Sequence, residues 1–179
     1  MSIRFNKILF PTDFSELALI ALQHAIDLAE AFGSQLHCLH VVDDAYQNWT
    51  ALGPESIPVG PPPDDLLELG RTRMEQFRNE HLARLQKAAI TQVAMGRPFA
   101  EIIRYAREQK IDLIVMGTHG RGAIAHMLLG GTTEKVVRKA PCAVLTVRTA
   151  GRDVVVLPSS PEGEDRAEAP AEKPSEGPI

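Results

Sequence analysis

The sequence predicts an α/β fold in which helices cover both faces of a parallel β-sheet. Short apolar segments of strand length alternate with longer segments whose apolar residues recur every three to four positions. Such alternation is typical of parallel sheets built from strand–helix–strand units. The segment 111–116 is almost entirely apolar, as expected for a strand that helices cover on both faces.

The first strand and helix have clear boundaries in the sequence. Residues 8–11 form a short apolar segment that Pro-Thr-Asp closes, which predicts a buried strand. Over 17–32 the apolar residues follow the spacing of an amphipathic helix. We expect Asp13 or Ser15 to cap this helix, and Gly33 to end it.

A second strand is predicted over 35–42, followed by a long loop or flap over 43–63. This loop contains five prolines and the only tryptophan, Trp49, and loops of this length are often functional. A long helix is then predicted over 64–88. His81 falls on its apolar side and is interpreted as a structural histidine.

The second half of the chain repeats the alternation. Three further strands are predicted, over 90–95, 111–116 and 142–147. Pro98 suits the first turn of the helix between the first two of them. Thr132 or Thr133 is expected to open the last helix, which ends before Pro141.

Composition divides the chain into a folded part, 1–149, and a tail, 150–179. The net charge of −4 lies entirely in the tail, so the folded part balances to zero. No basic face therefore argues for nucleic-acid or membrane binding. The tail is rich in Pro, Glu and Ser and is expected to be disordered. Within it, the apolar residues 154–157 either add a strand at a sheet edge or form a linker.

The N-terminus and the cysteines limit the class of protein. The first residues lack the apolar core of a signal peptide, so a cytoplasmic location is expected. Cys38 and Cys142 both lie in apolar strand-like segments and are interpreted as small buried hydrophobic residues. Their spacing to histidines does not match a zinc site.

The glycine-rich stretch after the fourth strand is the strongest functional signal. Phosphate oxygens can approach backbone N–H groups closely only where side chains are absent. Gly117, Gly120 and Gly130 remove those side chains, and a helix N-terminus follows near Thr132. The segment lacks the Gly-Lys-Ser/Thr of a P-loop and the Gly-x-Gly-x-x-Gly of a dinucleotide fold. Glycines alone also permit tight turns, and that simpler interpretation stays open here.

Several segments together resemble the universal stress protein family. Gly117-x-x-Gly120, nine residues and Gly130 resemble the Gly-2x-Gly-9x-Gly-(Ser/Thr) signature of its ATP-binding members. The segments 11–15, 41–42, 134–137 and 140–145 resemble the family's first-strand ending, the end of its second strand, and its closing helix and strand. The likeness covers about residues 3–148 in consistent order.

The resemblance implies a five-stranded parallel sheet of order 3-2-1-4-5 with a Rossmann-like arrangement. Cys38 and Cys142 would then lie three strand spacings apart, about 14 Å. A disulfide needs less than about 7 Å between Cα atoms, so none is expected within the subunit. The family's usual dimer pairs the fifth strands, which implies a homodimer through 142–147. An uncovered apolar edge strand is also an aggregation liability, which favours such pairing.

The resemblance also implies an adenine-nucleotide site, with ATP as the cofactor, with or without Mg²⁺, and AMP or ADP as other ligands. Pro11, Thr12 and Asp13 would meet the adenosine, Asp13 lying near the ribose or a Mg²⁺. Val41 would contact adenine, and Met116 and Gly117 would flank the base and ribose. The phosphates would be held by the remaining residues of the set: Gly120, Gly130, Gly131, Thr132 and Thr133.

Three observations qualify this nucleotide site. The family signature has Ser or Thr after the third glycine, whereas this chain has Gly131, which shifts the hydroxyl to Thr132. Asp13 and Val41 can also be interpreted as structural residues, Asp13 as a helix cap and Val41 as part of the core packing. His119 and Arg121 lie at the loop tip, where both either approach the phosphates or are solvated.

Three functions follow for comparison. The first is an ATP-binding stress protein that acts as a nucleotide-responsive switch through dimerisation or partner contacts. The second is a non-binding member of the family that serves as a protein-interaction module, against which the intact glycines argue. The third is a slow ATPase, for which His119 is the only candidate base; a single loop histidine is not a catalytic set.

Overall fold

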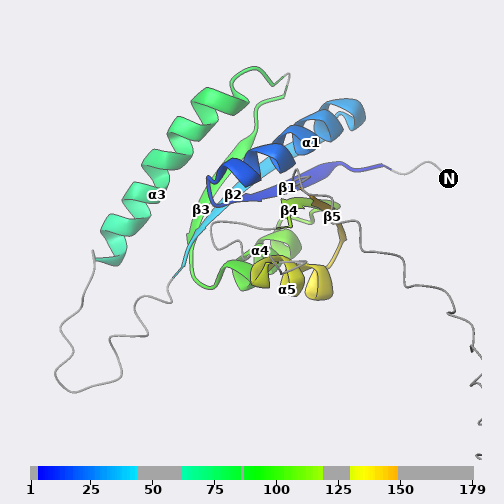
Figure 1. Cartoon of the computed structure of the whole chain (residues 1–179). Coiled ribbons are helices and arrows are strands. Elements are labelled where there is room, and N and C mark those ends of the chain that lie inside the picture. The colour runs from blue at the N-terminus through cyan, green and yellow to red at the C-terminus, as the bar shows by residue number, and fades with distance from the viewer. Residues whose placement is uncertain (1–3, 44–61, 86, 119–129, 149–179) are drawn as a thin grey trace, which may run out of the picture. The chain divides into compact units, whose positions relative to one another are not determined.

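The computed structural model of the chain describes residues 4–43, 62–85, 87–118 and 130–148 (Figure 1). Most of the predicted loop over 43–63 lies outside the described residues, as do Gly120, Arg121 and the tail from residue 150. The domain boundary between 149 and 150 therefore stays a prediction.

A five-stranded parallel sheet forms the centre of the described structure. Its strands are β1 (Lys7–Thr12), β2 (Gln35–Val42), β3 (Ile90–Met95), β4 (Leu113–Gly117) and β5 (Ala143–Val147). Their order is β3-β2-β1-β4-β5, and every described pair is parallel. The predicted order 3-2-1-4-5 is confirmed. It places β1 between β2 and β4, so the chain leaves β1 in one direction and later returns on its other side.

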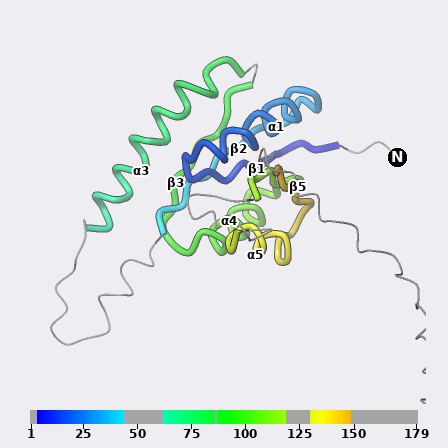
Figure 2. The backbone as a smooth tube through the Cα atoms, in the orientation of Figure 1, coloured from blue at the N-terminus to red at the C-terminus, as the bar shows by residue number. Residues whose placement is uncertain are grey.

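Helices cover both faces of this sheet. They are α1 (Glu16–Phe32), α3 (Pro63–Phe77) with the π-helical turn η1 (Arg78–Leu82), α4 (Pro98–Glu108) and α5 (Gly131–Lys139). Figures 1 and 2 show α1 and α3 on one face and α4 and α5 on the other. Two buried clusters match these layers: one contains Phe10 and Met74, the other Leu9 and Ile114. None of the described helices is long and apolar enough to cross a membrane.

Local signals set the ends of α1. Ser15 is the N-cap, and its Oγ accepts a hydrogen bond from the Ala18 N–H at 3.3 Å. Gly33 ends the helix with φ of 63°, a left-handed conformation that glycine adopts without steric cost. Phe32, predicted on the buried face, is 43% exposed and packs edge-on against Phe5 at 5.2 Å.

The predicted helix over 64–88 is too long. The α-helical part ends at Phe77, η1 follows, and Ala88 is an exposed residue outside any helix. The wider π turn accounts for the difference: Phe77 and Leu82 are both buried although they are five residues apart, a spacing that a π turn brings onto one side. His81 packs against the Phe77 ring at 5.0 Å, which agrees with a structural role.

Several other boundaries shift by one or two residues. β4 begins at Leu113, because the Asp112 carboxylate instead accepts hydrogen bonds from the Asn6 and Lys7 N–H groups at 2.7 and 3.0 Å. β5 begins after Cys142. α5 begins at Gly131, with the extended Gly130 rather than a threonine as its N-cap.

The two cysteines are free thiols in different surroundings. Cys38 on β2 is fully buried, and this burial raises the pKa of its thiol to about 12. Cys142 is only half-buried, so the prediction that both are buried is wrong for this one. β1 and β4 separate the strands that carry or follow these residues, which agrees with the expected distance between them.

A buried imidazole lies in the core on the α4 side. His37 is 1% exposed, and its Nδ1 is 3.0 Å from the Tyr105 hydroxyl oxygen. Its Nε2 has no hydrogen-bond partner among the described residues. Burial, and then the positive charge of Lys7, lower the pKa of His37 below its ordinary value, because both disfavour the imidazolium.

Stability should therefore fall in acid through His37. Below about pH 6.5 the unfolded chain binds a proton that folded His37 does not, so the free energy of unfolding decreases as pH falls toward the folded pKa, by at most about 1.4 kcal/mol per pH unit. Urea unfolding at pH 7 and pH 5 measures this. His37→Gln should show a smaller decrease between the two values than the parent chain. Equal decreases would contradict the assignment, and His24→Gln on the exposed face of α1 serves as the control.

Candidate functional site

The sheet opens at the carboxyl end of β1. Six residues of β1, Lys7–Thr12, pair with β2, but the pairing of β1 with β4 covers only Ile8 and Leu9. Pro11 lies beyond that point, where a residue without an N–H is tolerated. The resulting opening lies where the strand order reverses, which is the position at which open α/β sheets bind ligands.

A tight turn after β1 fixes one wall of this opening. The Thr12 Oγ1 accepts a hydrogen bond from the Phe14 N–H at 3.0 Å, and Phe14 adopts a left-handed φ of 60°. The Asp13 Oδ1 accepts from the Ser15 N–H at 3.0 Å and from its hydroxyl at 2.6 Å. Asp13 is thus held by the residue that caps α1, and it does not cap the helix itself.

The end of β2 forms the neighbouring wall. The His40 Nδ1 lies 2.8 Å from the Thr12 carbonyl oxygen; since a carbonyl can only accept, Nδ1 carries the proton. The His40 ring also packs on Phe14, with 4.3 Å between ring centroids. Because His40 joins β2 to the turn after β1, Val41 is held in a fixed position beside that turn.

The N-terminus of α5 faces the same opening and carries little side-chain cover. Gly130 is the N-cap, no described side chain caps this end, and the Gly130 N–H donates to the Thr118 carbonyl at 2.7 Å. A Cβ added at Gly131 would meet nothing within 4 Å. The first N–H groups of a helix have no partner within it, so α5 presents backbone donors and the positive end of its dipole.

The Thr133 hydroxyl has a partner that the sequence does not indicate. It donates to the Gly117 carbonyl oxygen at 3.0 Å, and the residue is only 4% exposed. That proton is therefore engaged in joining α5 to the end of β4, and the half-buried Thr132 is left as the hydroxyl donor of this segment.

These walls enclose a cavity of about 590 Å³, within the usual range for small-molecule sites. The structure brings ten of the predicted residues together around it: Pro11, Thr12, Asp13, Val41, Met116, Gly117, Gly130, Gly131, Thr132 and Thr133. The other two, Gly120 and Arg121, lie outside the described residues, as does His119.

Sequence reasoning missed one whole wall of the cavity, which α3 supplies. Leu66, Leu69, Gly70 and Arg73 line the cavity from this helix, and their spacing places them along one side of it. The sequence signal for this wall was Gly70, since a glycine inside a helix often marks close packing. A Cβ there would lie 3.1 Å from Val93 and 3.2 Å from Val42.

Other lining residues follow from the fold alone. Ala18, Leu39, His40, Val42 and Asp43 border the turn and the strand ends, and Pro98 and Ile102 come from α4. Among the described lining residues the charged side chains are Asp13, Asp43 and Arg73. No group of three or more His, Cys, Asp or Glu side chains in the described part of the chain could hold a metal ion.

Comparison with known proteins agrees with this geometry. The family model described as "Universal stress protein family" matches residues 4–148. Universal stress protein MJ0531 of Methanocaldococcus jannaschii is 34% identical over 151 residues, covering 80% of this chain and 82% of the relative. Universal stress protein MJ0577 of the same organism is 31% identical over 159 residues, covering 83% and 98%.

Solved structures show the same fold. MJ0577 superposes with a TM-score of 0.69 at 31% identity, covering 83% of this chain and 99% of that one. UspA from Lactobacillus plantarum gives 0.66 at 29% identity, covering 82% and 100%. A universal stress protein in complex with cAMP gives 0.61 at 21% identity, covering 81% and 98%, a likeness of fold alone. With the family match spanning nearly all described residues, this chain belongs to the universal stress protein family.

Proposed function

We propose that this chain binds ATP in the cavity at the carboxyl end of β1 and acts as a nucleotide-responsive switch in the stress response. One observation carries the proposal: the N-terminus of α5 presents backbone donors that no described side chain caps, with open space at Gly131, to a cavity of about 590 Å³. Helix N-termini of this kind bind phosphate through their N–H groups and dipole.

The two ends of the cavity differ in chemistry, and both suit a nucleotide. At the α5 end, Gly130, Gly131 and Thr132 would hold the phosphates with backbone N–H groups and one hydroxyl. Away from α5, Val41 on β2 supplies apolar surface for the base, and Met116 lines the cavity at the end of β4, on the α5 side. A planar apolar ring joined to an anionic chain therefore fits this arrangement better than a compact polar solute does.

Asp13 would serve the ribose or a magnesium ion between these ends. Its Oδ1 already accepts two hydrogen bonds from Ser15, so the carboxylate is oriented before a ligand binds. Mg²⁺ is usually held by one or two carboxylates together with substrate phosphates and water. A single acidic residue beside a triphosphate is sufficient for such a site.

The switch is proposed to act through the β5 edge of the sheet. β5 is the outer strand beside β4, and its Leu145 side chain is 38% exposed. α5 begins at the proposed phosphate site and packs on β5. A nucleotide bound at the N-terminus of α5 would therefore affect the position of β5. This is the edge strand through which we propose that two copies of the chain pair.

Titration calorimetry with ATP and Mg²⁺ tests the proposal. We expect binding well below millimolar ATP, and a higher unfolding temperature in saturating ATP, because a ligand that binds only the folded state stabilises it. Nucleotide released from the freshly purified protein by heat, identified by chromatography, gives a second reading. Sedimentation with and without ATP reports the switch. No binding at millimolar ATP would end the proposal.

A further inference from the structure

The α3 wall carries a cation that the nucleotide-binding motifs do not include. Among the described residues that line the cavity, Arg73 is the single cation, and the acidic ones are Asp13 and Asp43. Arg73 stands on α3, which covers one face of the sheet, whereas α5 lies on the opposite face (Figure 1). Arg73 is therefore separated from the end of the cavity assigned to the phosphates.

Arg73 has no partner among the described residues, in contrast to its neighbours on the helix. Arg71 pairs with Glu68 at 3.3 Å, and Arg78 pairs with Glu75 at 3.7 Å. Residues three and four positions apart meet on a helix. For Arg73 these are Leu69, Gly70, Gln76 and Phe77. The sequence thus offers Arg73 no acidic neighbour along the helix, and no described residue pairs with its guanidinium.

The direction of the helix aims this side chain at the cavity. In a strand–helix–strand unit α3 runs antiparallel to β2, so its N-terminus lies at the carboxyl ends of the strands. Long helical side chains lean toward the helix N-terminus, over the preceding turn. For Arg73 that turn contains Gly70, which has no side chain and packs closely on Val42 and Val93. Arg73 therefore extends over Gly70, toward the opening.

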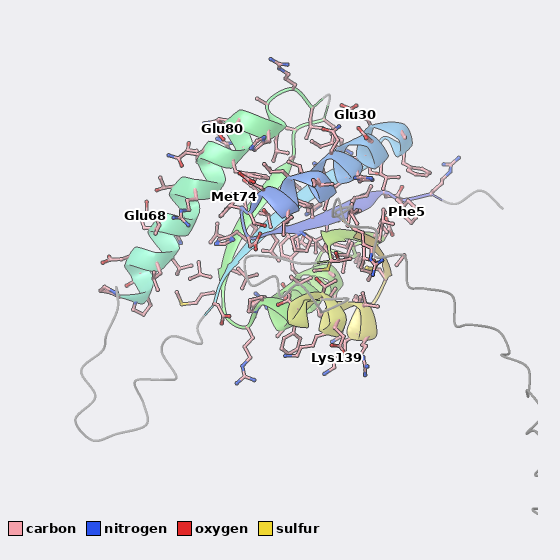
Figure 3. All side chains as sticks on the ribbon, in the orientation of Figure 1. Phe5, Glu30, Glu68, Met74, Glu80 and Lys139 are labelled. Atoms are coloured by element: carbon pink, nitrogen blue, oxygen red, sulfur yellow. The ribbon has the colours of Figure 1, made fainter. Side chains whose placement is uncertain are left out.

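The inner side of α3 contrasts with its outer side. Figure 3 shows Met74 between α3 and α1, whereas Glu68 lies on the other side of α3. Leu66 and Leu69 flank the cavity beside Arg73, and Leu69 is 49% exposed. An exposed leucine next to a guanidinium that no described residue pairs with forms a surface for a flat, apolar and electron-rich group.

We propose that Arg73 binds the base of the nucleotide, with its planar guanidinium lying against the ring. This inference rests on the proposed function and adds a contact from α3 to it. Guanidinium groups stack on aromatic rings through their planar, weakly hydrated face, and cation–π contacts of this kind are favourable at partly exposed sites.

The test compares Arg73→Gln with Arg71→Gln, a matched change two residues away on the same helix. We expect Arg73→Gln to weaken binding about fivefold, by the same factor for ATP and for AMP. Arg71→Gln should leave both affinities within about twofold. Arg73→Lys should restore only part of the loss, since lysine keeps the charge without the planar group. Calorimetry gives the affinities, and thermal unfolding of the free proteins confirms that all three variants fold.

Each alternative result has a defined meaning. If Arg73→Gln binds as Arg71→Gln does, or if Arg73→Lys binds like the parent chain, the stacking contact is wrong. A loss for ATP that disappears for AMP would assign Arg73 to the phosphates and overturn the inference, while the proposed function stands. Failure of the parent chain to bind either nucleotide would contradict both the proposed function and this inference.

Discussion

Replacing Phe10 by alanine is expected to lower the free energy of unfolding by about 4 kcal/mol, the largest stability effect we predict for a single side chain. Phe10 is fully buried in β1, a strand with neighbours on both sides. Its ring stacks on Phe77 of α3, with 6.3 Å between centroids and 12° between planes. Removing the ring leaves a cavity between the sheet and α3 that close-packed neighbours cannot fill.

Urea denaturation of the parent chain and of Phe10→Ala measures this loss. Phe32→Ala is the control, because Phe32 is 43% exposed and contacts Phe5 at the rim of α1; we expect it to cost less than about 1.5 kcal/mol. Similar losses for the two variants would contradict the burial that places Phe10 at the centre of the core.

Replacing Gly131 by aspartate should weaken ATP binding about a hundredfold while the fold is retained. A Cβ at this position meets no atom within 4 Å, so the side chain is accommodated without strain. The new carboxylate would stand among the N–H groups proposed to hold the phosphates and would repel them; two like charges about 4 Å apart interact by about 4 kcal/mol near a protein surface. A carboxylate in the first turn also favours the helix itself.

The matched control is Gly131→Asn, which has nearly the same shape and no charge. Calorimetry should show a much smaller loss for it than for Gly131→Asp, and the Gly131→Asp loss should grow from AMP to ATP as the charge of the ligand rises. Equal losses for the two variants would mean that bulk, not charge, is responsible. An unchanged ATP affinity in Gly131→Asp would place the phosphates elsewhere.

The elements that the sequence predicted well are those with local causes. Ser15 and Gly33 bound α1 through a hydrogen bond and a left-handed φ that the residue types themselves favour. Boundaries failed where packing decided them. The turn of η1 depends on burying both Phe77 and Leu82, and β4 begins late because Asp112 pairs with the backbone of a segment about a hundred residues away.

The residues that line the cavity divide in the same way, into those that the sequence predicted and those that it did not. The residues of its β1, β4 and α5 walls lie at the ends of two strands and at the start of a helix after the glycine-rich stretch, where the resemblance to the family's motifs placed them. The α3 wall comes from a helix whose sequence predicted only core packing, and nothing in that pattern placed Gly70 and Arg73 on the cavity that Val41 and Asp13 also line. The sequence likewise predicted a phosphate contact for the Thr133 hydroxyl, but only the structure shows that this hydroxyl donates to the Gly117 carbonyl.

The sequence alone determined the alternation of strands and helices, the glycines that keep the start of α5 free of side chains, and the two ends of α1, because these depend on residue types and short-range spacing. The tertiary structure decided which helix closes the cavity, where Arg73 extends and how Thr133 is used. Those outcomes depend on contacts between segments far apart in the chain, and the close approach of α3 to β2 and β3 at Gly70 exists only once the sheet has formed.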